Sequence, residues 1–227
     1  MNSLKSRTIR WNPQLICDCG FNKYVLVILN RRIEFEKEFM ISLWNKDSFF
    51  AAHKKILVDG GANHWFEFLK KHNLSNADKR NIPDFITGDL DSVTQVVLNS
   101  FELLGTKIVR TPDQDETDFT KALHVLAEQS QIISHTFQVE AVVTLAETCG
   151  RFDQIMANIN TLYKAKNIFS APVYLLSKES ITWILWTGEH EIEIKLRENS
   201  GNKWCSLIPI GRRCNKVTTS GLKWNLA

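Results

Sequence analysis

Up to about residue 176, hydrophobic positions alternate between two repeating patterns. Short apolar runs predict strands, and longer stretches with apolar residues every three or four positions predict helices. The predicted strands are Tyr24–Leu29, Ile56–Val58, Phe85–Thr87, Lys107–Val109, Val139–Leu145 and Val173–Leu176. The predicted helices are Phe35–Trp44, His64–His72, Val93–Leu104, Asp118–Gln129 and Phe152–Ala165. This alternation favours an α/β fold, with a Rossmann-like parallel sheet covered by helices on both faces.

The pattern changes after a connecting segment at 177–180. Shorter strand-like runs follow, at Trp183–Trp186, His190–Leu196, Trp204–Pro209 and Lys216–Thr219. In the second run Ile192, Ile194 and Leu196 alternate with charged residues, which is typical of an antiparallel sheet. We therefore expect a tail over 1–20, an α/β domain over 21–176 and an antiparallel β-sandwich domain over 177–227, which the end of the chain leaves incomplete.

Composition excludes several classes of protein. Among 227 residues, 44% are hydrophobic and 23% are charged, as in an ordinary globular protein. The net charge of +3 is too small and too scattered to indicate a nucleic-acid partner, and no apolar run is long enough to cross a membrane. Five cysteines without a paired C-x-x-C pattern favour free thiols in a reducing cytosol. We expect a cytoplasmic protein.

The segment Thr111–Lys121 is unusually acidic, with four carboxylates between a predicted strand and a predicted helix. Carboxylates that lie close together repel one another unless a cation neutralises them. A divalent metal that holds phosphates is a common reason for such a cluster. Acidic or glycine-rich loops also follow three other predicted strands, at Asp59–Asn63, Gly88–Ser92 and Gly150–Gln154.

These four loops all lie between a strand and a helix, at the edge where ligands bind in parallel sheets. Any one of them is explained equally well by a helix cap or a tight turn. Together they favour a site for Mg²⁺ and phosphate. Its expected residues are Asp59, Asp89, Asp91 and Asp118 on the metal, Lys121 on phosphate, and Arg151 stabilising a transferring phosphoryl group. Charge alone also permits a Mg²⁺-dependent nucleotide hydrolase.

The order of these motifs resembles that of the thiamine pyrophosphokinase family, from about Lys23 to Leu226. Thr218–Trp224 is similar to the C-terminal motif of that family. The resemblance implies a cytosolic homodimer that transfers a pyrophosphoryl group from ATP to thiamine and releases AMP. It also implies that Asp59, Asp89, Asp91 and Asp118 hold Mg²⁺ and the phosphates, that Asn63, Thr117, Arg151 and Asp153 line the nucleotide, that Gln114 meets the thiamine pyrimidine, and that Trp224 of the partner subunit stacks on the vitamin.

Two departures from the family pattern change the expectation. This chain has Ala146-Glu147 where the family has a glycine pair, and Glu147 adds negative charge beside the expected phosphates. We therefore predict that Glu147→Gly raises nucleotide affinity. The family also continues through further strands beyond the position of Ala227. A shortened chain that dimerises or binds nucleotide without catalysis is therefore the alternative to an active enzyme.

Overall fold

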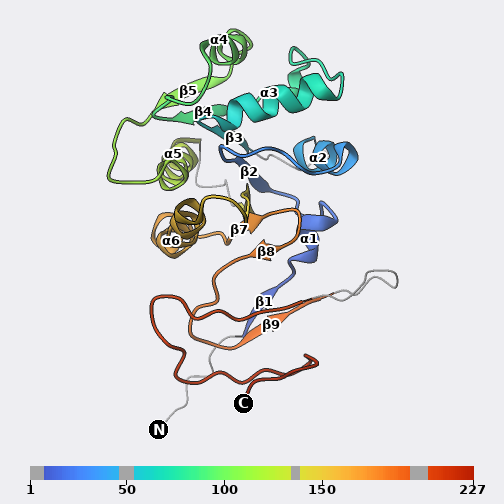
Figure 1. The fold of residues 1–227 in the computed structure, drawn as a ribbon, viewed down its shortest axis with the longest axis vertical. Coiled ribbons are helices and arrows are strands. Elements are labelled where there is room, and N and C mark those ends of the chain that lie inside the picture. Colours follow the sequence, from blue (N-terminus) through green and yellow to red (C-terminus); the bar gives the residue numbers. More distant parts are fainter. Residues whose placement is uncertain (1–7, 46–53, 134–138, 195–203) are drawn as a thin grey trace. The chain divides into compact units, whose positions relative to one another are not determined.

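The computed structural model describes residues 8–45, 54–133, 139–194 and 204–227. The chain divides into two compact units, residues 1–194 and residues 195–227. All the helices and strands of the described residues lie in the first unit (Figure 1).

A seven-stranded sheet of order β5-β4-β3-β2-β6-β7-β8 forms the centre of the first unit. Neighbouring strands are parallel except β7 and β8, which are antiparallel. Strands β3, β4 and β5 follow one another on one side of β2, and β6 and β7 then lie on its other side, as in doubly wound sheets. The strands are β2 Tyr24–Ile28, β3 Lys54–Val58, β4 Phe85–Gly88, β5 Lys107–Arg110, β6 Ala141–Leu145, β7 Val173–Leu176 and β8 Ile181–Thr182.

Helices cover both faces of this sheet (Figure 1). One core contains residues of α1 to α4 and the other contains residues of α5 and α6. Strand β2 is buried along its whole length, with Leu26 in the first core and Val25 and Val27 in the second, which explains its uninterrupted apolar run. The helices are α1 Gln14–Cys17, α2 Lys37–Trp44, α3 Gly61–Lys71, η1 Lys79–Asn81, α4 Gln95–Leu103, α5 Asp118–Ile133 and α6 Phe152–Ile168.

The alternation predicted up to residue 176 is confirmed, but the N-terminal segment is not a simple tail. Strand β1, Ile9–Trp11, pairs in parallel with β9, His190–Ile192. Trp11 Nε1 donates a hydrogen bond of 2.9 Å to His190 Nδ1, across 179 positions of sequence. A three-residue strand with so distant a partner leaves no periodic signal in the sequence.

The strand predictions beyond residue 182 are mostly wrong within the described residues. Only β9 forms, its pairing with β1 is parallel rather than antiparallel, and Trp183–Trp186 is not a strand. In the second unit, residues 204–227 contain no strand, although Thr219 N donates a hydrogen bond of 2.9 Å to Leu226 O. These residues are mostly exposed, and apolar alternation alone does not form a strand without a paired neighbour. Leu196 lies outside the described residues.

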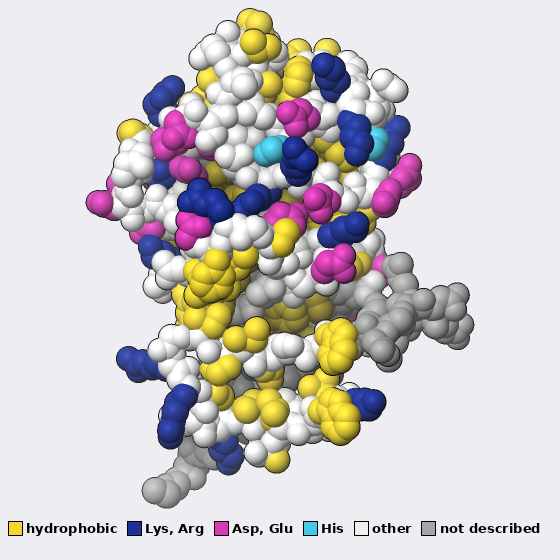
Figure 2. All heavy atoms as spheres, in the orientation of Figure 1, with side chains coloured by type: hydrophobic (Ala, Val, Ile, Leu, Met, Phe, Trp, Pro, Cys, Tyr) yellow, Lys and Arg dark blue, Asp and Glu magenta, His cyan; other side chains and the backbone are white. Residues whose placement is uncertain are grey.

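The structure bears on three expectations from composition. None of the five cysteines, all of which lie within the described residues, forms a disulfide. Acidic and basic side chains are interspersed over part of the face that Figure 2 displays, whereas residues 204–227 carry Arg and Lys but no acidic side chain. Among the described residues, no helix has the length and apolar character needed to span a bilayer.

Two indole rings anchor α2 and α3 beside the sheet. Trp44 and Trp65 are fully buried and stack with ring centroids 3.7 Å apart. Trp65 Nε1 also donates a hydrogen bond of 2.9 Å to Asn81 O. Because the rings contact each other and lie in the first core, they fix the distance between the two helices.

We expect Trp65→Ala to lower the free energy of unfolding by about 3–5 kcal/mol, since it leaves a large cavity and an unpaired carbonyl. Urea unfolding followed by circular dichroism measures the change. Leu103→Ala in α4 is the matched control, because Leu103 is 88% exposed and should cost less than about 0.5 kcal/mol. Equal effects of the two changes would contradict this account of the core.

Candidate metal and phosphate site

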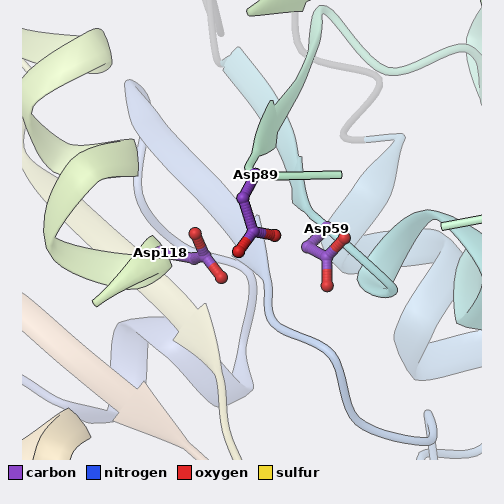
Figure 3. Close-up of side chains that lie close together, drawn as sticks. All are labelled: Asp59, Asp89 and Asp118. Atoms are coloured by element: carbon purple, nitrogen blue, oxygen red, sulfur yellow. The ribbon is translucent and has the colours of Figure 1, made fainter. Parts of the chain in front are cut away.

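Three carboxylates from different elements meet at the carboxyl edge of the sheet (Figure 3). Asp59 follows β3, Asp89 follows β4, and Asp118 begins α5. Each offers an oxygen, and these oxygens lie within 4.8 Å of one another. Three of the four loops predicted at this edge therefore converge, and the group contains three carboxylates rather than the expected four.

The backbone around Asp59 is tightly constrained. Asp59 is buried and has a positive φ of 48°, an uncommon conformation for a residue other than glycine. Its N–H donates a hydrogen bond of 2.8 Å to Thr87 O, and its Oδ1 accepts one of 3.1 Å from Ser92 N. Gly88 has φ of 139°, and a Cβ at Gly88 would lie 3.0 Å from the Cβ of Asp59. Glycine at 88 thus permits the close approach of β4 to Asp59.

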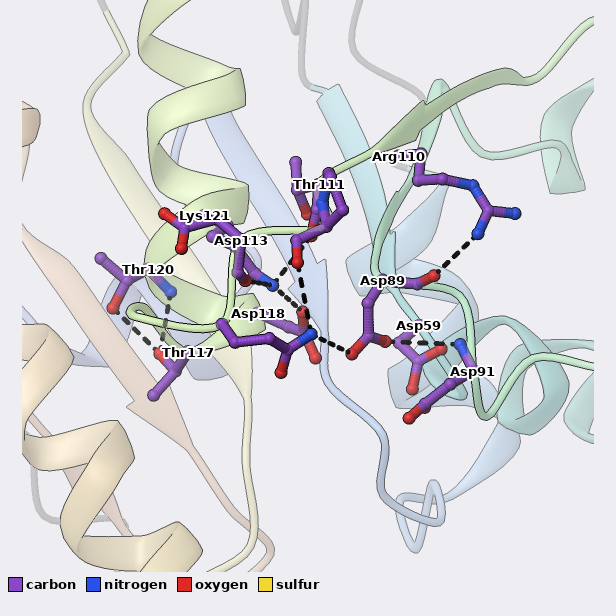
Figure 4. Close-up of polar contacts among 12 residues, drawn as sticks. Asp59, Asp89, Asp91, Arg110, Thr111, Asp113, Thr117, Asp118, Thr120 and Lys121 are labelled. Carbon is purple, nitrogen blue, oxygen red and sulfur yellow. Dashed lines mark hydrogen bonds and ion pairs between the residues drawn. The ribbon is translucent and has the colours of Figure 1, made fainter.

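The side chains around Asp89 show why Asp91 is outside the group (Figure 4). Asp91 N donates a hydrogen bond of 3.3 Å to Asp89 Oδ1, so the loop turns between these residues. The exposed carboxylate of Asp91 accepts a hydrogen bond of 2.8 Å from Ser92 Oγ. Gln114 Nε2 lies 3.3 Å from Asp89 Oδ2, and thus beside the carboxylate group. Asp91 therefore lies outside the group of three carboxylates in this structure, and its predicted contact with the metal stays a prediction.

Lys121 is buried and holds the acidic run against α5. Its Nζ donates hydrogen bonds of 2.9 Å to Thr111 O and 2.7 Å to Asp113 O (Figure 4). The same atom lies 2.8 Å from Asp118 Oδ1 as an ion pair. Two hydrogen bonds and one ion pair therefore hold the ammonium group to this loop and helix. Phosphate contact by Lys121 stays a prediction, and the observed contacts favour a positioning role.

Thr117 and Asn63 both hold loops in place at this edge. Thr117 precedes α5, and its Oγ1 accepts a hydrogen bond of 3.1 Å from Thr120 N, as a helix cap does. Asn63 lies in the first turn of α3. Its Nδ2 donates a hydrogen bond of 2.8 Å to Ser92 O, and its Oδ1 accepts one of 3.0 Å from Thr94 N. Asn63 therefore fixes the loop that carries Asp89. Their predicted contacts with nucleotide stay predictions.

Arg151 and Asp153 form an exposed pair at the start of α6. Arg151 Nε donates a hydrogen bond of 3.1 Å to Asp153 Oδ1, and Nη2 contacts the other oxygen. The hydrogen bond from Arg151 lowers the pKa of Asp153 below its ordinary value. Within the described residues, no hydrogen bond or ion pair joins this pair to the three carboxylates. Its predicted place beside the nucleotide is therefore untested.

Trp224, predicted to stack on thiamine, lies in the second unit. Its side chain is 77% exposed, and Lys223 Nζ lies 5.3 Å from the ring centroid. An exposed indole with a cation beside it is available for stacking, but its role stays a prediction.

The loop after β2 contributes basic and polar groups that the sequence analysis did not assign to the site. Asn30 Oδ1 lies 3.2 Å from His64 Nε2, which ties this loop to the first turn of α3. Burial lowers the pKa of His64; Glu67 opposes the shift, while Arg32 and Arg31 contribute to it. The rule that identified the acidic loops, their position after a parallel strand, applies equally to Arg31 and Arg32.

The carboxylate group fits a hard divalent cation such as Mg²⁺. Three like charges within 4.8 Å favour a bound cation, and carboxylate oxygens are its usual ligands. Among the described residues, Asp118 is the one carboxylate of the three that forms an ion pair with Lys121, and the buried Oδ1 of Asp118 has no hydrogen bond. Asp59, Asp89 and Asp118 are therefore the residues that would hold the metal.

The fold is thus a doubly wound α/β fold with an acidic group at its ligand-binding edge. Comparison with known proteins agrees with this class. Residues 42–175 match the family described as "Thiamin pyrophosphokinase, catalytic domain", and residues 189–227 match "Thiamin pyrophosphokinase, vitamin B1 binding domain". The chain belongs to the thiamin pyrophosphokinase family.

Individual relatives cover most of the chain. Thiamine pyrophosphokinase 1 of Oryza sativa subsp. japonica is 33% identical over 214 residues, which are 89% of this chain and 74% of that protein. Thiamine pyrophosphokinase 3 of the same plant is 34% identical over 208 residues, covering 89% and 73%. The solved thiamin pyrophosphokinase from Candida albicans superposes with a TM-score of 0.69 at 28% identity, covering 83% of this chain and 68% of that one.

We expect Lys121→Met to lower the free energy of unfolding by about 2–4 kcal/mol, because two carbonyls and one carboxylate lose their cationic partner. Urea unfolding without Mg²⁺ or ATP measures the loss. Combining Lys121→Met with Asp118→Asn should cost less than the sum of the single changes, since the two groups interact.

Lys71→Met, at an exposed lysine of α3, is the matched control and should change stability by less than about 0.5 kcal/mol. Unchanged stability in Lys121→Met, combined with lost ATP binding, would instead support the phosphate contact predicted from the sequence.

Proposed function

We propose that this chain transfers the pyrophosphoryl group of ATP to the hydroxyl of thiamine and releases AMP. The observation that carries the proposal is the group formed by Asp59, Asp89 and Asp118 at the carboxyl edge of the sheet. Membership of the thiamin pyrophosphokinase family supports the choice of thiamine as acceptor, because charge alone would equally suit a nucleotide hydrolase.

The reaction joins the thiamine hydroxyl oxygen to the β-phosphorus of ATP. The bond between that phosphorus and the oxygen leading to the α-phosphorus breaks, AMP leaves, and the hydroxyl loses its proton. Reactions of this class depend mainly on positioning and on neutralising charge. A bound Mg²⁺ would neutralise phosphate charge and orient the phosphoryl oxygens.

The chain's own residues then have separate tasks. Asp59, Asp89 and Asp118 hold the metal, while Lys121 keeps the acidic run on α5. Gln114 reaches the site from that run and lies 3.3 Å from Asp89, where it can orient the acceptor. Asp91 is an exposed carboxylate in the loop after β4, and we propose that it joins the site when metal and nucleotide bind.

We propose that further residues contact the nucleotide and that the chain forms a homodimer. Arg151 stabilises the transferring group, and Asn63, Thr117 and Asp153 lie on the nucleotide side. We also propose a homodimer in which Trp224 of the partner subunit stacks on thiamine, in the cytoplasm. The exposed indole of Trp224 is compatible with such stacking.

We expect Asp89→Asn and Asp118→Asn each to lower thiamine-dependent AMP release at least about 100-fold, since each removes a charge from the metal site. Asp91→Asn should lower it about tenfold, since its carboxylate is outside the group. A coupled assay for AMP with Mg²⁺, ATP and thiamine measures turnover.

Asp78→Asn is the matched control, because Asp78 pairs with Arg80 away from this edge and should leave turnover unchanged. Phosphate or ADP release that does not require thiamine would point to a hydrolase. Normal turnover in both Asp89→Asn and Asp118→Asn would refute the assigned site.

A further inference from the structure

The loops after β2 and β6 leave the sheet side by side, at the place where the strand order reverses. Ile28 of β2 pairs with Leu145 of β6, and Leu29 N lies 3.4 Å from Leu145 O. The residues that follow are Asn30 to Arg32 in one loop and Ala146 to Gly150 in the other. Ligands of doubly wound sheets bind at such a reversal.

Arg31 brings a positive charge to this place. A methyl group built on Gly150 would lie 3.4 Å from Nη1 of Arg31, so the guanidinium lies against the loop after β6. The side chain of Arg31 is half-buried and has no hydrogen bond or ion pair with any residue that the structure describes. Arg110 and Arg151 differ from it, since each already donates to an oxygen of the protein.

Glu147 faces the same place from the other loop. Its side chain is half-buried. Burial raises the pKa of Glu147, as does Glu34, whereas hydrogen bonding by Cys149 and the charge of Arg31 oppose the shift. The charges of Arg31 and Glu147 therefore attract each other across the two loops, without a direct ion pair.

The strand that precedes Arg31 is the neighbour of the strand that precedes Asp59. Strand β2 lies beside β3, and neighbouring strands are about 4.8 Å apart, so the loop of Arg31 is one strand from that of Asp59. Asp59, Asp89 and Asp118 carry three negative charges, one more than a divalent cation would neutralise. A polyphosphate bound there would add further negative charge, which favours a nearby basic side chain whose N–H groups are free to donate.

We infer that Arg31 binds the polyphosphate of ATP from the loop after β2, and that Glu147 competes with these phosphates for its guanidinium. The planar guanidinium can donate two parallel hydrogen bonds to phosphate oxygens. The inference rests on the proposed function for the presence of ATP, but concerns binding rather than transfer. Glu147 then tunes nucleotide affinity, because its negative charge attracts the same guanidinium that the phosphates would bind.

Calorimetric titration with Mg²⁺–ATP, in the absence of thiamine, tests both statements. We expect Arg31→Gln to weaken binding about tenfold, the scale of one charged hydrogen bond. Arg31→Lys, which keeps the charge but lacks the planar fork, should recover part of the loss. Arg10→Gln is the matched control, since Arg10 is exposed in β1 and pairs with Glu191.

Glu147→Gln should tighten binding about threefold to fivefold in the otherwise unchanged chain, and should have no effect when combined with Arg31→Gln. An equal gain in both backgrounds would show that Glu147 repels phosphate directly, and would overturn the competition. Unchanged affinity in Arg31→Gln, or no binding of Mg²⁺–ATP by the unchanged chain, would overturn the assignment of Arg31. If the Arg31 and Glu147 variants change the affinity for Mg²⁺–ATP as expected, but the unchanged chain releases no AMP with thiamine, only the proposed function would be refuted.

Discussion

Repulsion among Asp59, Asp89 and Asp118 is the constraint on which the arrangement of this edge depends. Three carboxylates within 4.8 Å do not stay together without compensation. The structure supplies part of it through the backbone N–H of Ser92 on Asp59 and the ammonium of Lys121 on Asp118. A bound cation and its ligand would supply the rest. Without them, the repulsion among the carboxylates lowers the stability of the fold.

The position of the site was predictable because parallel strands place their carboxyl ends together. Asp59, Asp89 and Asp118 each follow or face such an end, and alternation along the sequence was enough to find the strands. The direction of Asp91 was not predictable, since it depends on Leu90, which has a positive φ of 66°. Nothing in a leucine indicates that conformation, so two carboxylates that are near in sequence point to different partners.

Lys121 shows a second limit of reading sequence by residue type. A lysine one turn into a helix, beside an acidic run, suggests a phosphate ligand. Its burial and its bonds to Thr111 O and Asp113 O depend on how the preceding loop folds back, which side-chain chemistry alone does not indicate. Arg31 is the converse case, because the sequence analysis gave this residue no role, yet it follows β2 where the sheet order reverses. Tertiary position, rather than charge, separates these two cations.

The pairing of β1 with β9 has a consequence for how the chain folds during synthesis. Trp11 and its partner His190 are 179 positions apart, so β1 has no partner until nearly the whole first unit has left the ribosome. At ordinary rates of elongation the delay is about 10–35 s. Strands β2 to β7 are all synthesised before β9, and the N-terminal strand is therefore among the last parts of the unit able to join a sheet.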